Sequence, residues 1–165
     1  MKAESTQTTP IIEDRSEEHY VGIRTQTPFS GMFAALEPLQ KELRKWASAE
    51  GLSGIYILRF HVIDMRGLMD LEVGLKTASR VEGNKRVKPG VLPAGKYASL
   101  IYRGKGRAGH SALLNWIQSE GLSAGVETTP AGDHFASRYE SFLTDPRVES
   151  RKLLQDIQLS IKLRD

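Results

Sequence analysis

The stretch Trp116-Ile-Gln-Ser-Glu-Gly-Leu-Ser-Ala-Gly125 echoes an earlier one, Trp46-Ala-Ser-Ala-Glu-Gly-Leu-Ser-Gly54, and this echo decides the fold. Tryptophan, glutamate, glycine, leucine and serine recur at five positions, each 70 residues from its counterpart. Each copy has the form of the last turn of an amphipathic helix, followed by a glycine suited to the left-handed position that ends a helix. We therefore interpret the pair as an internal duplication of one small α+β unit.

The first copy has the pattern of a strand, a helix and two further strands. His19–Thr25 alternates apolar and polar residues, as a strand does. Apolar residues at helical spacing then predict a helix that ends near Glu50, with a kink or the start of its main part at Pro38. Ile55–Ile63 and Leu68–Lys76 are predicted strands, and the nearly continuous apolar run of the first favours a central place in a sheet.

The second copy is predicted to contain the same elements in the same order: strand Lys96–Tyr102, helix Ala108–Glu120, and strands Phe135–Leu143 and Leu153–Leu163. Asp156–Lys162 resembles Asp70–Lys76, which is a second trace of the duplication. Short connections between the later strands of each copy favour antiparallel pairing. We predict repeats at 11–77 and 94–164, joined by a polar linker at 78–93. Met1–Pro10 has little to bury and is predicted to be disordered.

The composition restricts the class of protein. At 165 residues and a net charge of +3, the chain fits one domain that is too weakly basic to indicate nucleic-acid binding. It contains no cysteine, which excludes disulfides, thiolate metal sites and cysteine nucleophiles. No segment is long and apolar enough to span a bilayer, so we expect a cytoplasmic protein without a membrane partner.

Two motifs match catalytic signatures without the context that these need. Gly104–Gly109 has the glycine pattern of dinucleotide-binding loops, but the parallel βαβ unit with its acidic residue is missing. We interpret the basic loop Arg103–Arg107 as a mobile rim that can attract anions. Gly121–Gly125 matches a nucleophile elbow, but it follows a helix rather than a strand, so Ser123 is not a predicted nucleophile. The histidines lack metal-ligand spacing and are interpreted as isolated polar or capping residues; no metal or cofactor is predicted.

The segment Phe135–Leu143 contains the most informative carboxylate. Strand alternation places Arg138, Glu140 and Phe142 on one face. If that face lines the interior, Glu140 must pair with a cation, accept several hydrogen bonds or take up a proton, because a buried carboxylate charge is costly. The alternative is a solvent-facing Glu140, and Glu72 poses the same question. Rings that could add cation–π contacts to a cationic ligand are those of Tyr102, Trp116 and Phe60.

With these residues the chain resembles the GyrI-like family, the small-molecule-binding domain also found at the C-termini of multidrug-responsive transcription regulators of the AraC and MerR classes. The resemblance spans roughly residues 11–164. The segments that carry it are Pro93–Gly104, Trp116–Gly121, Arg138–Pro146 and Leu154–Ile161, with His61–Met65 and Asp70–Gly74 in the first copy.

The resemblance implies an α+β fold of tandem pseudo-twofold β-α-β-β repeats, in which an antiparallel sheet and two main helices flank a central ligand groove. It implies that Glu140 is the acidic residue of that groove, and that Glu72 matches an acidic position of stand-alone members. The aromatic residues that could line the groove, or belong to the core, are Trp46, Phe60, Tyr102, Trp116 and Phe142. The regulators carry a separate DNA-binding domain, for which the first ten or so residues leave no room, so no direct nucleic-acid binding is expected.

Three functions remain open. The first is a module that senses or sequesters lipophilic, often cationic, small molecules. The second is a hydrolase, since some stand-alone members of the family hydrolyse electrophilic cyclopropanoid compounds, and Glu140 and Glu72 in one groove could activate water or protonate a leaving group. The third, a protein inhibitor of DNA gyrase, is disfavoured by the basic charge balance. Antiparallel sheet edges could also pair two copies into a homodimer.

Overall fold

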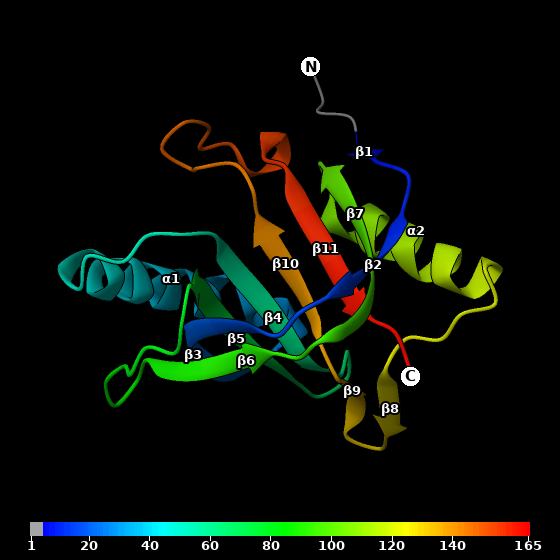
Figure 1. Cartoon of the computed structure of the whole chain (residues 1–165), viewed down its shortest axis with the longest axis horizontal. Helices are drawn as coiled ribbons and strands as arrows, with labels where there is room; N and C mark the ends of the chain where they lie inside the picture. Colours follow the sequence, from blue (N-terminus) through cyan, green and yellow to red (C-terminus); the bar gives the residue numbers. More distant parts are fainter. Residues whose placement is uncertain (1–4) are drawn as a thin grey trace.

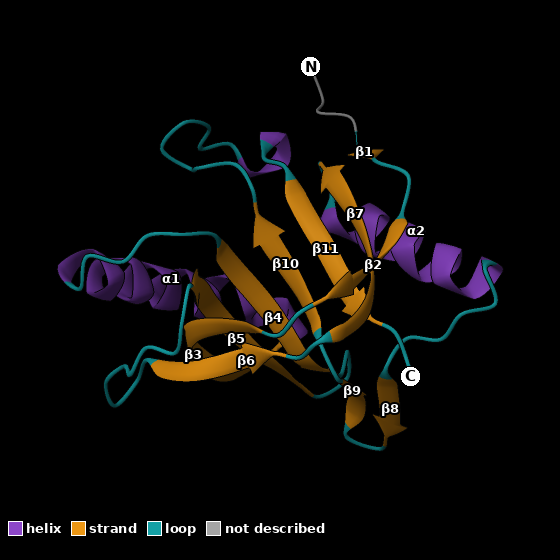
Figure 2. Ribbon diagram, in the orientation of Figure 1, coloured by secondary structure: helices purple, strands orange, loops and turns teal. Residues whose placement is uncertain are grey.

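The computed structural model describes residues 5–165 as one antiparallel sheet with two long helices on one face (Figure 1, Figure 2). The first repeat contains β3 (Glu18–Pro28), α1 (Met32–Ala49), β4 (Tyr56–Ile63) and β5 (Leu68–Thr77). The second repeat contains β7 (Gly95–Arg103), α2 (Gly106–Ser119), β10 (Arg138–Phe142) and β11 (Ile157–Lys162). The α+β fold and the predicted order of strand, helix, strand and strand are confirmed in both repeats. Within residues 5–165, no helix is long and apolar enough to cross a membrane.

The strands of the two repeats form one continuous order, β7-β11-β10-β4-β5-β3, in which each strand has its counterpart at the mirrored place. The repeats meet where β10 pairs with β4, and there Glu140 lies opposite Leu58. Glu140 also pairs with Leu159 of β11, and Leu58 pairs with Val73 of β5; Leu159 and Val73 hold the same place in the two matching segments. Glu140 and Leu58 are therefore equivalent residues that face each other across the pseudo-twofold axis.

Five shorter strands extend this frame within the described residues: β1 (Thr6–Gln7), β2 (Ile11–Arg15), β6 (Lys88–Leu92), β8 (Val126–Thr129) and β9 (Gly132–Phe135). Both β1 and β2 pair with β7, so the prediction of disorder is wrong for Thr6–Gln7, while residues 1–4 lie outside the described residues. β6 pairs with β3 and occupies part of the segment predicted as linker. Pro89 hides this strand from sequence patterns, yet an edge strand tolerates it.

Two predicted strands of the second repeat are shorter than expected. Residues 135–143 are split, because β9 ends at Phe135 and pairs with β8 and the end of β4, whereas β10 begins at Arg138 and pairs with β11. Residues 153–156 precede β11, and a short 3₁₀ turn, η2 (Lys152–Leu154), lies there instead. A similar turn, η1 (Phe29–Gly31), leads into α1, so Pro38 lies inside the helix rather than at its start.

Each helix packs its apolar face on its own repeat. The α1 core includes Leu36 and Leu43, packed with residues of β3, β4 and β5. The α2 core includes Leu113 and Ile117, packed with residues of β7 and β11. Phe142, on β10, packs against both cores and so connects the repeats on the helix side. A third cluster covers the opposite face and consists of Tyr20, Ile57, Leu92, Tyr97 and Tyr139.

Both helices end in the same way. Gly51 and Gly121 each have a φ of +70°, the left-handed conformation predicted for them. The next residues close the helices, because Leu52 N–H donates to the Ala47 carbonyl over 2.9 Å and Leu122 N–H donates to the Ile117 carbonyl over 3.0 Å. Repetition of this geometry supports the interpretation of the two segments as duplicates.

Replacement of Gly121 tests the helix stop. Open space surrounds its missing Cβ, so backbone conformation alone sets the cost. We expect Gly121→Ala to lower the free energy of unfolding by about 1 kcal/mol, and Gly121→Asn to cost less because asparagine tolerates this conformation. Urea unfolding at neutral pH measures both variants. Equal stability of the alanine variant and the parent chain would contradict the assignment.

Candidate functional site

Glu140 lies on the helix side of the sheet and contacts α2. Only 8% of the residue is exposed. Its Oε2 atom accepts a hydrogen bond from the Tyr102 hydroxyl on β7 and lies 2.9 Å from Nε2 of His110 on α2. Glu140 therefore faces the interior and not the solvent, and two polar side chains satisfy one of its oxygens.

His110 connects Glu140 to Arg138. Its Nδ1 atom lies 2.6 Å from a terminal nitrogen of Arg138, which can only donate. Nδ1 therefore accepts, and the imidazole carries its proton on Nε2, where it donates to Glu140. Carboxylate and guanidinium balance each other through a neutral ring. The interpretation of His110 as an isolated polar residue is wrong, because β10 brings both partners to it from 28 and 30 residues along the chain.

The protonation states of this cluster follow from burial and hydrogen bonding. Burial by itself raises the pKa of the Glu140 carboxyl, but the hydrogen bonds from His110 and Tyr102 outweigh burial and hold this pKa below its ordinary value. Burial lowers the pKa of Arg138 to about 10, so its guanidinium stays charged at neutral pH. Burial and the charge of Glu140 raise the pKa of the Tyr102 hydroxyl, which remains a donor.

Two of the predicted aromatic residues lie beside this cluster. The buried rings of Phe60 and Tyr102 both stand edge-on to His110, with centroids 5.4 and 6.2 Å from that of the imidazole. Phe142, two residues beyond Glu140 on the same face of β10, is half-buried between the two cores. An aromatic wall therefore adjoins the carboxylate on the helix side.

The two tryptophans lie elsewhere. Trp46 and Trp116 are half-buried, and each packs against the core of its own repeat. Both belong to the last turns of α1 and α2, whose C-terminal ends point to opposite sides of the molecule (Figure 1). Their matching places reflect the duplication, and neither is among the side chains that hydrogen-bond or stack within the Glu140 cluster.

A contact between Lys152 and Phe33 joins the two repeats near this cluster, and no sequence pattern predicts it. Nζ of Lys152, in η2, lies 3.7 Å from the ring centroid of Phe33 on α1. Burial lowers the pKa of Lys152, and the charge of Glu140 acts against that shift. A cation from the second repeat thus covers an aromatic ring of the first, within electrostatic range of Glu140. No local pattern marks either residue, because their segments are separated by more than 100 positions.

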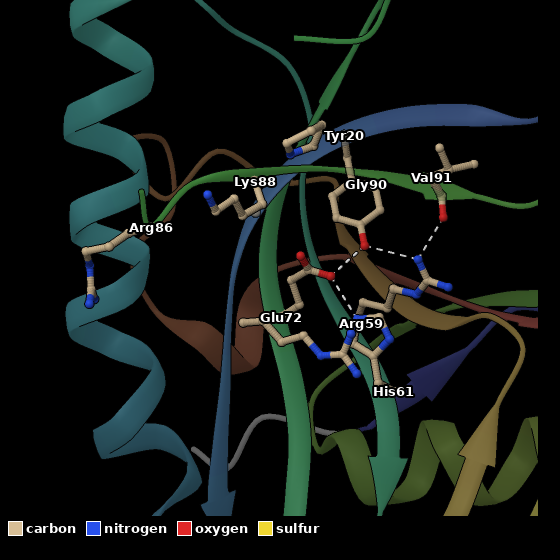
Figure 3. Close-up of a pocket in the computed structure, with 11 residues that line it drawn as sticks. Tyr20, Arg59, His61, Glu72, Arg86, Lys88, Gly90 and Val91 are labelled. Atoms are coloured by element: carbon tan, nitrogen blue, oxygen red, sulfur yellow. Dashed lines mark hydrogen bonds and ion pairs between the residues drawn. The ribbon is translucent and has the colours of Figure 1, made fainter. Parts of the chain in front are cut away.

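Glu72 forms a second cluster of similar composition and lines a cavity of about 520 Å³ (Figure 3). Its Oε1 atom accepts a hydrogen bond from the Tyr20 hydroxyl over 2.5 Å and lies 2.8 Å from Nε2 of His61. The Tyr20 hydroxyl in turn accepts a hydrogen bond of 3.0 Å from Arg59. Glu72 is 6% exposed. Within residues 5–165, no group of three or more histidine, aspartate or glutamate side chains could hold a metal ion.

The two carboxylates lie on opposite faces of the sheet. Glu140 pairs with Leu58, and Glu72 pairs with Arg59, the next residue of the same strand. Successive side chains of a strand point to opposite faces, and paired residues share a face. Leu58 packs in the α1 core, whereas Arg59 contacts Tyr20 and β6. The expectation that Glu140 and Glu72 share one groove is therefore wrong, because the sheet separates them.

A buried carboxylate beside aromatic rings, at the junction of two repeated units, is compatible with a small-molecule-binding domain. The chain belongs to the GyrI-like family: the family described as the GyrI-like small molecule binding domain matches residues 8–162. We find no relative among curated protein sequences.

Solved structures share the fold at low sequence identity. The EcmrR chain of an EcmrR–DNA complex is 17% identical with a TM-score of 0.68; the match covers 95% of this chain and 57% of EcmrR. The isolated EcmrR C-terminal domain is 15% identical with a TM-score of 0.64, and 95% and 98% of the two chains are covered. SAV2435 bound to tetraphenylphosphonium is 11% identical, with a TM-score of 0.60 over 95% and 94% of the chains. A hydrolase from Listeria innocua is 13% identical, with a TM-score of 0.60 over 94% and 91%.

Acid titration tests the electrostatics of Glu140. Since its pKa is lower in the folded chain than in the unfolded chain, Glu140 stabilises the fold above the unfolded value of about 4.3 and loses this contribution as the pH falls through the lower folded value. Urea unfolding between pH 7 and pH 3 should therefore show a shallower loss of stability for Glu140→Gln than for the parent chain. The exposed Glu127→Gln is the control and should follow the parent. An unchanged pH dependence in Glu140→Gln would contradict the depressed pKa.

Proposed function

We propose that this protein binds lipophilic, often cationic, small molecules in a groove between α1 and α2, with Glu140 at its floor, as a sensing or sequestering module. The observation that carries the proposal is the buried Glu140 at the junction of the repeats, facing the helices. Membership in a family of small-molecule-binding domains supports it. The structure of SAV2435 with tetraphenylphosphonium, a lipophilic cation, is consistent with this ligand class.

The geometry around Glu140 suits a ligand with diffuse positive charge. Both of its hydrogen bonds involve Oε2, which leaves the lone pairs of Oε1 for a ligand. Arg138 balances the carboxylate through His110, so the cluster carries little net charge and tolerates burial in the free protein. The rings of Phe60 and Phe142 add dispersion and cation–π attraction that depend weakly on ligand shape. Such a site favours bulky, weakly hydrated cations over compact ones.

Titration with tetraphenylphosphonium tests this site, with isothermal titration calorimetry as the readout. We expect saturable binding that Glu140→Gln weakens about tenfold, since loss of one buried charge removes about 1.4 kcal/mol of attraction. Glu127→Gln removes the same charge from an exposed position and should bind as the parent chain does. Equal affinity of Glu140→Gln and the parent chain would remove Glu140 from the site.

A second function, hydrolysis of electrophilic cyclopropanoid compounds, is favoured by the groups around Glu140. The Tyr102 hydroxyl and the Nε2–H of His110 both reach its carboxylate, so a proton has a route to a bound leaving group or from a bound water. Glu72 lies on the other face of the sheet and would take no part in this hydrolysis. The fold shared with a hydrolase from Listeria innocua is compatible with it.

Substrate loss separates the two functions. Incubation of the protein with a reactive cyclopropanoid should leave the compound intact if the protein is a binding module. Turnover by the parent chain, reduced at least 100-fold in Glu140→Gln and retained in Glu127→Gln, would instead establish the hydrolase. Single-turnover measurements with excess protein distinguish slow catalysis by this protein from turnover by a trace of contaminating enzyme.

A further inference from the structure

We propose that the cavity on the helix-free face is a second ligand site, which binds a small molecule carrying a carboxylate or phosphate group. The cavity measures about 520 Å³, within the range of pockets for small organic ligands. Its walls come from β3, β4, β5 and β6, with Arg86 from the segment before β6 (Figure 3). The cavity is independent of the ligand groove proposed on the helix side, because the sheet lies between the two.

The cavity exists because the sheet curls strongly at this edge. Two strands, β5 and β3, separate β4 from β6 in the sheet order. Nevertheless, Arg59 of β4 donates a hydrogen bond of 2.8 Å to the Val91 carbonyl of β6. The edge strand β6 and the central strand β4 therefore approach each other over the helix-free face. Close packing is possible because Gly90 lies against the Tyr20 ring, where a Cβ atom would overlap the ring.

The lining is rich in positive charge. Its cationic residues are Arg24, Arg59, Arg86 and Lys88, against the single carboxylate of Glu72. Two of the cations are committed elsewhere, since Arg24 pairs with Asp70 and Arg86 pairs with Glu42. The remaining two, Arg59 and Lys88, face one carboxylate, which leaves one positive charge in excess at the cavity.

Arg59 and Lys88 also have unused hydrogen-bonding capacity. Arg59 is only 9% exposed, and its Nε–H has no acceptor within the described part of the protein. An unsatisfied buried donor is unfavourable, and an acceptor oxygen of a ligand that reached this donor would satisfy it. Lys88 is exposed on β6 and forms no ion pair within residues 5–165. A carboxylate or phosphate bound between these two side chains would meet a fixed donor and a mobile cation.

The charge of Glu72 does not prevent this. Both hydrogen bonds to its carboxylate, from Tyr20 and His61, hold Oε1 in place. Arg59 donates to the Tyr20 hydroxyl, so the guanidinium is linked to Glu72 through the phenol. Glu72 thus orients the base of the cavity, while Arg59 of β4 and Lys88 of β6 select the sign of the ligand.

Binding of two probes, inorganic phosphate and benzoate, tests the proposal by two-dimensional amide NMR of the full chain at low salt. We expect saturable shifts at Gly22, Gly90 and Val91 with at least one probe, and the probe that binds identifies the anionic group. Lys88→Gln should weaken that binding about fivefold, as expected for loss of one partly solvated charge. The matched control is Lys41→Gln, an exposed lysine of α1 outside the cavity, which should bind as the parent chain does.

Three results would overturn the proposal: no saturable shifts with either probe, shifts confined to residues outside the cavity, or equal weakening by Lys41→Gln and Lys88→Gln. Because Lys88 is exposed, its replacement leaves the fold intact, whereas Arg59→Gln removes several structural hydrogen bonds and is unsuitable alone. Addition of tetraphenylphosphonium to the benzoate-saturated protein separates the two sites. Shifts at the cavity should persist, even if the cation fails to bind in the groove.

Discussion

Pairing between β10 and β4 is the interaction on which the rest of this structure depends. It joins two three-stranded units into one sheet and sets the register in which Glu140 lies opposite its own counterpart, Leu58. A carboxylate at this position has a helix from each repeat on its side of the sheet, and only the second repeat supplies the polar groups that it needs. A symmetric frame thus contains one asymmetric site, since an apolar leucine occupies the equivalent position.

Both buried carboxylates are stabilised by the same kind of network. A tyrosine and a histidine contact each carboxylate. An arginine that hydrogen-bonds to one of these two side chains balances the charge: Arg138 contacts His110, and Arg59 contacts Tyr20. Removal of water from a lone carboxylate would cost several kcal/mol, which such pairing offsets. The clusters are nevertheless not duplicates of each other, because they involve different strands and opposite faces.

Local patterns predicted the elements of the fold and also their order. The echo around Trp46 and Trp116 revealed the repeats, and their glycines marked where the helices end. Strand alternation placed Glu140 correctly on the face that it shares with Phe142. Alternation cannot relate the faces of two different strands, however, until their register is known, and for this reason Glu72 was assigned to the wrong side. The role of His110 was hidden in the same way, since its partners lie on a strand that is remote in sequence.

Phe142 has a consequence for the way in which this chain unfolds. One ring belongs to the apolar cores of both halves, next to the strand pair that joins them. Neither half can lose its packing without exposing part of the other, so we expect the two repeats to unfold together as one cooperative unit. An ancestral single unit would have had to present this surface to a second copy of itself.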